Sequence, residues 1–127
     1  MQNKTIILLA RIILGALLVI FGLNKIFFFM PMPQLPPGAD ELMGAFAQSG
    51  YIFPLLIVVE IGTGILLLIN LFTPLALILL APLSVNIMLF HMALDPLGIG
   101  AAAIVFLLNL FLLISYRDKF GPLLKIK

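Results

Sequence analysis

Residues 53–71 read FPLLIVVEIGTGILLLINL, an apolar run that contains one charged residue, Glu60. Folded as a helix with a rise of about 1.5 Å per residue, a run of this length can cross the hydrocarbon core of a membrane. Three other stretches of the chain are similarly long and apolar. We therefore predict an all-α fold, a transmembrane four-helix bundle. Its expected spans are residues 5–29, 53–71, 74–92 and 97–116.

The composition of the 127-residue chain excludes an ordinary soluble domain. Hydrophobic residues make up 64% of the sequence and charged residues only 9%, whereas about half and about a quarter are typical of soluble globular domains. So few polar side chains cannot cover a water-facing surface of this size. We expect residues 1–127 to form a single integral membrane domain in contact with the lipid bilayer.

Several kinds of chemistry are excluded by the residue types that the chain lacks. It has no cysteine and one histidine, which excludes disulfides, thiol redox chemistry, iron–sulfur clusters and bis-histidine haem ligation in this chain. It also has no glycine-rich phosphate loop and no basic stripe with interleaved aromatic residues. We therefore expect no metal site, no nucleotide site of that type and no nucleic-acid partner.

The loop between the first two spans, residues 30–50, differs in character from the spans. We expect Asp40-Glu41 to open a short helical stretch, residues 42–48, which Gly50 closes. This short helix is predicted to lie at the membrane interface. Four prolines before it are expected to hold the chain extended. They are Pro31, Pro33, Pro36 and Pro37.

The distribution of cations predicts how the bundle is oriented. With four crossings both chain ends lie on one side of the membrane, and lysine and arginine near the ends of spans favour the cytoplasmic side. Five cations fall on the side of the termini, whereas the opposite loops carry acids and no lysine or arginine. Both termini are therefore predicted to be cytoplasmic. The cations are Lys4, Arg117, Lys119, Lys125 and Lys127, and the acids are Asp40, Glu41 and Asp95.

Two charged residues inside the spans predict an ion pair. Lys25 lies at the outer end of the first span, against the preference for cytoplasmic cations, and therefore requires a partner. Glu60 lies seven residues inside the antiparallel second span from the same side, so the two side chains can meet at a similar depth. The pair either contributes to a ligand site or only fixes the register of the two helices.

His91 is expected near the outer end of the third span, in the same layer as Lys25 and Glu60. A histidine there can exchange a hydrogen bond with a ligand carbonyl or relay a proton. Alternatively, it caps the end of its own helix close to Asp95. The first interpretation makes Lys25, Glu60 and His91 the candidate ligand-binding residues of one polar pocket.

Arg11 lies about 9 Å into the first span. From this depth a long side chain can reach the cytoplasmic headgroups while its stem stays in the hydrocarbon. We therefore expect Arg11 to extend toward the membrane surface and not to belong to the candidate pocket.

Small and polar residues inside the spans predict where helices pack closely. Gly15 and Gly22 share one face of the first span, and Gly64 lies one turn after the acid of the second. Asn109, the most polar residue inside the fourth span, is expected to hydrogen-bond across helices as a packing contact. The glycine faces can pack within one chain or between copies, which leaves a homo-oligomer open.

These residues form a series of short motifs along the spans. The motifs are Arg11, Gly15, Gly22-x-x-Lys25, Val59-Glu60-x-x-x-Gly64, Pro74-Leu75-Ala76-Leu77, Asn86-Ile87-x-x-x-His91 and Tyr116-Arg117-Asp118-Lys119-Phe120-x-Pro122-Leu123-Leu124. In this order and spacing they resemble the DoxX family of small four-helix bacterial membrane proteins, over nearly the whole chain. The resemblance implies a multi-pass protein of the bacterial cytoplasmic membrane that is associated in some members with oxidoreductase systems, including a thiosulfate:quinone oxidoreductase.

Three functions are compatible with these residues. The leading one is a subunit of a redox complex that binds a quinone-like or lipid ligand in the pocket of Lys25, Glu60 and His91. The alternatives are a non-catalytic accessory or scaffold subunit, and a small transporter or proton conductor that uses Glu60 and His91. No redox-active side chain or cofactor ligand set is present, so the sequence leaves open whether the chain is itself an enzyme.

Overall fold

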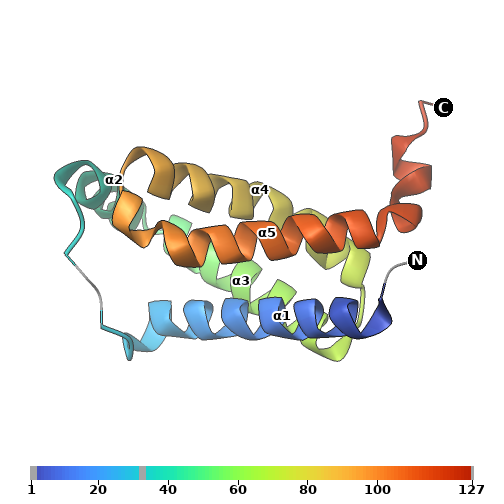
Figure 1. The fold of residues 1–127 in the computed structure, drawn as a ribbon. Helices are drawn as coiled ribbons and strands as arrows, with labels where there is room; N and C mark the ends of the chain where they lie inside the picture. The colour runs from blue at the N-terminus through green and yellow to red at the C-terminus, as the bar shows by residue number, and fades with distance from the viewer. Residues whose placement is uncertain (1–2, 32–33, 127) are drawn as a thin grey trace.

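The computed structural model describes residues 3–31 and 34–126, and the regular elements within these ranges are all helical (Figure 1). Four segments of the described chain are long and apolar enough to cross a membrane. They correspond to α1, α3, α4 and η1 with α5. The elements are α1 (Lys4–Phe27), α2 (Pro37–Ser49), α3 (Ile52–Ile69), α4 (Thr73–Ala93), η1 (Pro96–Gly98), α5 (Ile99–Ser115) and η2 (Arg117–Leu124).

The predicted four-helix fold is confirmed, and the four long apolar helices begin and end within one or two residues of the expected spans. α1 ends two residues early because Phe28 adopts the left-handed conformation, with φ of 53°, and its N–H donates to the Asn24 carbonyl at 2.8 Å. α3 likewise ends before Asn70, which has φ of 55°. A left-handed residue at this position satisfies a terminal carbonyl and redirects the chain out of the helix.

The short helix α2 begins earlier than predicted. We expected extended chain at Pro36 and Pro37 and a helix only from residue 42, but α2 starts at Pro37. The first turn of a helix makes no use of its N–H groups, so proline starts a helix there without the loss of a hydrogen bond. The predicted closure at Gly50 is confirmed, with φ of 79°. Pro33 lies outside the described residues.

The long helices run side by side, each antiparallel to the next along the chain (Figure 1). α1 packs mainly on α3 and α4 mainly on α5, while contacts of α3 with α4 and of α1 with α5 complete the bundle. Both chain termini and the α3–α4 turn lie at one end, which we call the terminal end. The opposite end carries α2 and η1, and we call it the loop end.

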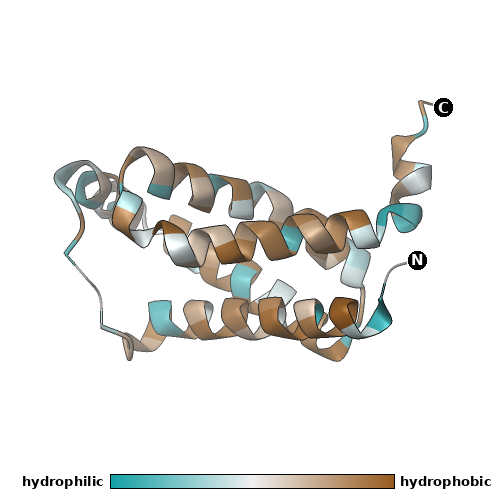
Figure 2. Cartoon of the chain, viewed as in Figure 1, coloured by the Kyte–Doolittle hydropathy of each residue, from teal (hydrophilic) through white to brown (hydrophobic). Residues whose placement is uncertain are grey.

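Apolar side chains cover the outside of the bundle as well as its core. Figure 2 shows hydrophobic residues along the four long helices and hydrophilic residues concentrated toward the two ends. Outward-facing Leu89 and Leu107 are more than half exposed. An apolar surface of this extent suits contact with lipid and not with water. The largest fully buried apolar side chains are Leu14, Leu18, Leu67, Leu77, Leu80 and Leu112.

α1 and α3 approach each other closely at two glycines, Gly15 and Gly64. A Cβ atom placed on either glycine would lie 2.9 Å from the backbone carbonyl oxygen of the other, and a Cβ on Gly64 would also lie 2.8 Å from Val19 Cγ2. These distances are too short for a side chain. The two backbones can therefore pack at this separation only with glycine on both helices, and the contact forms within one chain.

Gly64→Ala is expected to lower the free energy of unfolding by about 1–3 kcal/mol, because the new methyl group forces α1 away from α3. Gly62→Ala is the matched control, since a Cβ at Gly62 meets no atom within 4 Å. Unfolding of the detergent-solubilised protein, followed by circular dichroism, measures both. Equal stability of the two variants would contradict the close glycine contact.

Candidate functional site

Lys25 and Glu60 form the predicted ion pair, between the last turn of α1 and the middle of α3. The Lys25 ammonium donates to both carboxylate oxygens of Glu60, at 2.9 Å to Oε1 and 2.8 Å to Oε2. The Glu60 side chain is only 3% exposed, whereas that of Lys25 is 28% exposed. The pair therefore places a buried carboxylate behind a cation that lies at the edge of the bundle.

Gly22 lies one turn before Lys25 and allows α1 to come close enough for this pair. A Cβ atom on Gly22 would lie 2.5 Å from Ile61 Cγ1 and 3.4 Å from Glu60 Cβ. A larger residue at this position would press against the part of α3 that carries the carboxylate. The glycines of α1 and α3 thus position the charged pair as well as the two backbones.

His91 is paired with Asp95 and not with Lys25 or Glu60. Its Nδ1 lies 3.3 Å from Asp95 Oδ2 and 3.1 Å from the Asp95 carbonyl oxygen. The ring also lies against Gly98, where a Cβ atom would be 2.6 Å from His91 Cε1. Within the described ranges, no hydrogen bond or ion pair joins His91 to Lys25 or Glu60. The arrangement matches the alternative in which His91 caps the end of its own helix.

The expectation that Arg11 extends toward the membrane surface is wrong. Arg11 is buried, and its Nη1 donates to the backbone carbonyl of Leu67 and, at 3.4 Å, to that of Leu68. α3 ends at Ile69, so these carbonyls belong to its last turn, where carbonyls lack the usual helical N–H four residues later and the helix dipole is negative. The Leu67 carbonyl also accepts a long hydrogen bond, of 3.4 Å, from the Asn70 N–H. A cation at this place is held inside the bundle by α3.

Asn109 forms the cross-helix contact that the sequence predicts. Ser84 Oγ donates to Asn109 Oδ1 at 2.9 Å, and Asn109 Nδ2 donates to the Leu77 carbonyl at 3.3 Å. Both side chains are buried, so these hydrogen bonds tie α4 to α5 in the interior. Asn86 instead donates to the Pro82 carbonyl of its own helix, at 2.9 Å.

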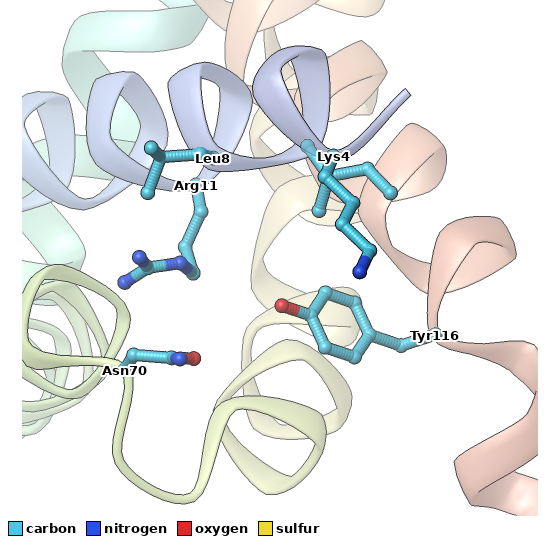
Figure 3. Close-up of a pocket in the computed structure, with 6 residues that line it drawn as sticks. Lys4, Leu8, Arg11, Asn70 and Tyr116 are labelled. Atoms are coloured by element: carbon cyan, nitrogen blue, oxygen red, sulfur yellow. The ribbon is translucent and has the colours of Figure 1, made fainter. Parts of the chain in front are cut away.

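Cavities lie at both ends of the bundle. A cavity of about 200 Å³ at the loop end is lined by Gln34, Pro36, Asp95, Leu97 and Gly98, next to His91. Another, of about 230 Å³, lies at the terminal end, and Figure 3 shows the side chains that line it. Neither is lined by Lys25 or Glu60. In the part of the chain that the structure describes, no three His, Asp or Glu side chains are grouped to hold a metal ion.

The terminal-end cavity brings together residues that the sequence did not connect. Its polar lining is Lys4 and Arg11 of α1, Asn70 of the α3–α4 turn and Tyr116 at the end of α5. From the sequence, Lys4 indicates only the orientation of the bundle in the membrane. An asparagine directly after an apolar helix is a signal for a left-handed helix end, which would have located the end of α3 and the carbonyls near Arg11.

Removal of one partner of the Lys25–Glu60 pair is expected to have unequal effects. Lys25→Met leaves a carboxylate buried without a cation and should cost about 3–5 kcal/mol of unfolding free energy. Glu60→Gln should cost less, because the partly exposed ammonium can turn toward the membrane surface. The double variant Lys25→Met/Glu60→Gln should recover most of the loss. Unfolding of the unmodified protein, the two single variants and the double variant in detergent measures the energetic coupling between Lys25 and Glu60. Strictly additive losses of unfolding free energy would contradict this coupling.

Comparison with known proteins identifies a family match. The family model described as DoxX matches residues 6–93, which include nearly all of α1 and the whole of α2 to α4, and therefore Arg11, Lys25, Glu60 and His91. The segment 116–124, which also carries the resemblance, lies outside the matched residues. No curated protein and no solved structure matches the chain. With a family match over more than half of its length and four helices that can span a bilayer, the chain is a multi-pass integral membrane protein and belongs to the DoxX family.

Proposed function

We propose that this chain is a small subunit of a membrane redox system and binds a quinone-like or lipid ligand at the loop end of its bundle. The proposed site is centred on Lys25 and Glu60, with His91 at the same end. The observation that carries the proposal is the Lys25 ammonium, which a buried carboxylate holds at the edge of the bundle. The redox association follows from the DoxX resemblance.

The Lys25 ammonium has a donor available for a ligand. An ammonium carries three N–H donors, and two of them bind the carboxylate oxygens of Glu60. No other described residue accepts a hydrogen bond from Lys25, and its side chain is partly exposed. A quinone carbonyl or a lipid ester oxygen is a suitable acceptor for the third donor.

His91 contributes a second polar group at the loop end. Asp95 orients its ring through Nδ1. The other ring nitrogen, Nε2, has no acceptor or donor among the described residues and is not enclosed by protein. It can therefore exchange a hydrogen bond with a ligand carbonyl or pass on a proton, beside the cavity that Asp95 and Gly98 line.

One observation favours a second candidate, a non-catalytic accessory or scaffold subunit. The candidate polar residues inside the spans all have a partner in the same chain. Arg11 binds helix carbonyls, Lys25 binds Glu60 and His91 binds Asp95. Such pairs also fix helix register without any ligand. In that case the loop end and α2 would contact another membrane subunit.

Native mass spectrometry of the protein released gently from its own membranes separates these two functions. For a ligand-binding subunit we expect a bound quinone or lipid. Its occupancy should fall about tenfold or more in Glu60→Gln, because the Lys25 ammonium loses the carboxylate that holds it in place. Glu41→Gln is the matched control, since it makes the same change at an exposed site in α2 at the loop end.

Full ligand occupancy in Glu60→Gln would overturn the proposed site. A stoichiometric protein partner without a bound small molecule would assign the chain to the accessory class.

We also propose that the terminal end faces the cytoplasm and that α2 lies at the outer surface. Lys4, Arg117, Lys119 and Lys125 lie at or near the terminal end, while Lys127 lies outside the described residues. Among the described residues, the loop end carries Lys25 as its cation, and that cation is paired. A cytoplasmic terminal end agrees with the preference of cations for that side.

Single cysteines test this orientation cleanly, because the chain has none of its own. Gln48→Cys in α2 is expected to react with a membrane-impermeant maleimide on intact cells. Gly121→Cys, which is also exposed but lies at the terminal end, should react only after the cells are permeabilised. The reverse labelling pattern would contradict the orientation.

A further inference from the structure

The terminal-end cavity is a second polar site, separate from the one proposed above. Lys4 and Arg11 project from α1 into the same region as Asn70 from the α3–α4 turn and Tyr116 from the end of α5 (Figure 3). The remaining lining residues are the apolar Ile7 and Leu8. These residues come from three separate parts of the sequence, so the site exists only in the folded bundle.

The cavity is electropositive and rich in hydrogen-bond donors. Among the described residues, its lining contains two cations and no acid, and the Asn70 amide and the Tyr116 hydroxyl supply neutral donors. The backbone carbonyls that bind Arg11 offset part of its positive charge through their dipoles, but they carry no net charge. Two positive charges at the edge of a hydrocarbon region favour an anionic ligand.

Arg11 is held in place with donors to spare. A guanidinium carries five N–H donors, and the Arg11 bonds to protein are made by Nη1 to the carbonyls of Leu67 and Leu68. Nε and Nη2 have no acceptor among the described residues. Every fully buried side-chain nitrogen among the described residues has a hydrogen-bond partner. Since Nε and Nη2 have none, these two nitrogens are not fully buried and are accessible. A fixed guanidinium with free donors fits the oxygens of a phosphate group.

The depth of the cavity matches a lipid headgroup. Lys4 is the first residue of α1, and Arg11 lies seven residues further on, about 10 Å deeper along the helix. Tyr116 lies at the end of the last span, where aromatic residues meet the headgroup layer. A ligand that reaches from Lys4 to Arg11 therefore has its charge at the interface and apolar wall residues beside it.

We propose that this cavity binds a phosphate oxyanion, carried by the headgroup of an anionic phospholipid or by a soluble phosphate. Arg11 and Lys4 are the charged contacts, and Asn70 and Tyr116 add hydrogen bonds. The apolar wall of Ile7 and Leu8, together with the position at the membrane edge, favours the lipid source.

The test is a titration of the detergent-purified protein, by native mass spectrometry, with phosphatidylglycerol, phosphatidylcholine or inorganic phosphate. Lys4→Gln and Tyr116→Phe are the main variants, because both leave the Arg11 bonds to α3 intact. Lys119→Gln is the matched control, since it removes one positive charge near the same end from a residue outside the cavity.

Phosphatidylglycerol is expected to bind the unmodified protein more tightly than phosphatidylcholine. Lys4→Gln should weaken this binding about fivefold, the usual effect of one cation near an anionic lipid. Tyr116→Phe removes one hydrogen bond and should weaken binding by a smaller factor. Lys119→Gln should leave it within about twofold, because Lys119 does not line the cavity. Saturable binding of inorganic phosphate that is weakened by Lys4→Gln, with no preference for phosphatidylglycerol, supports the site and assigns it to soluble phosphate.

Two results would overturn the proposal: binding of neither phosphate source, or equal losses in Lys4→Gln and Lys119→Gln. Arg11→Gln gives an independent check in the fraction that remains folded, where binding should fall further than in Lys4→Gln. Unchanged binding in the folded Arg11→Gln protein would also overturn it. None of these results depends on Glu60, so this site and the loop-end site succeed or fail separately.

Discussion

The close packing of α1 on α3 is the contact on which the polar interior depends. In lipid, apolar side chains gain little by leaving the surrounding hydrocarbon, so helix association relies on tight packing and polar contacts. Gly15 and Gly64 let the two backbones approach until a Cβ on one would lie 2.9 Å from the other's carbonyl. At that separation Lys25 reaches both oxygens of Glu60 across the same interface.

The charged groups inside the bundle are stabilised in different ways. Glu60 is almost fully enclosed and is neutralised by a full opposite charge. Arg11 is enclosed as well, but its partners are the end carbonyls of α3, which have only partial negative charge. His91 lies beside Asp95, four residues later along the chain. Asn109 is satisfied without any charge, by the Ser84 hydroxyl and the Leu77 carbonyl.

The sequence was sufficient for features that follow from pattern alone. Apolar length located the four spans, and a cation at the outer end of the first span, opposite the lone acid of its antiparallel neighbour, located the Lys25–Glu60 pair. The partner of Arg11 was missed because it is a backbone carbonyl, which becomes available only where α3 ends, at the left-handed Asn70. For His91 the sequence allowed two partners, and the choice of Asp95 depends on the turn after α4, where Gly98 makes room for the ring.

The two ends of the bundle therefore differ in what they require from a ligand. At the loop end the Lys25 charge is already balanced by Glu60, so a neutral acceptor such as a carbonyl can bind without leaving a buried charge unpaired. At the terminal end the positive charges of Arg11 and Lys4 have no acid in the cavity lining. Carbonyl dipoles satisfy hydrogen bonds of Arg11 but cannot cancel its charge in a region of low dielectric constant. A bound oxyanion cancels it, which is why an anionic group belongs at the terminal end and a neutral one at the loop end.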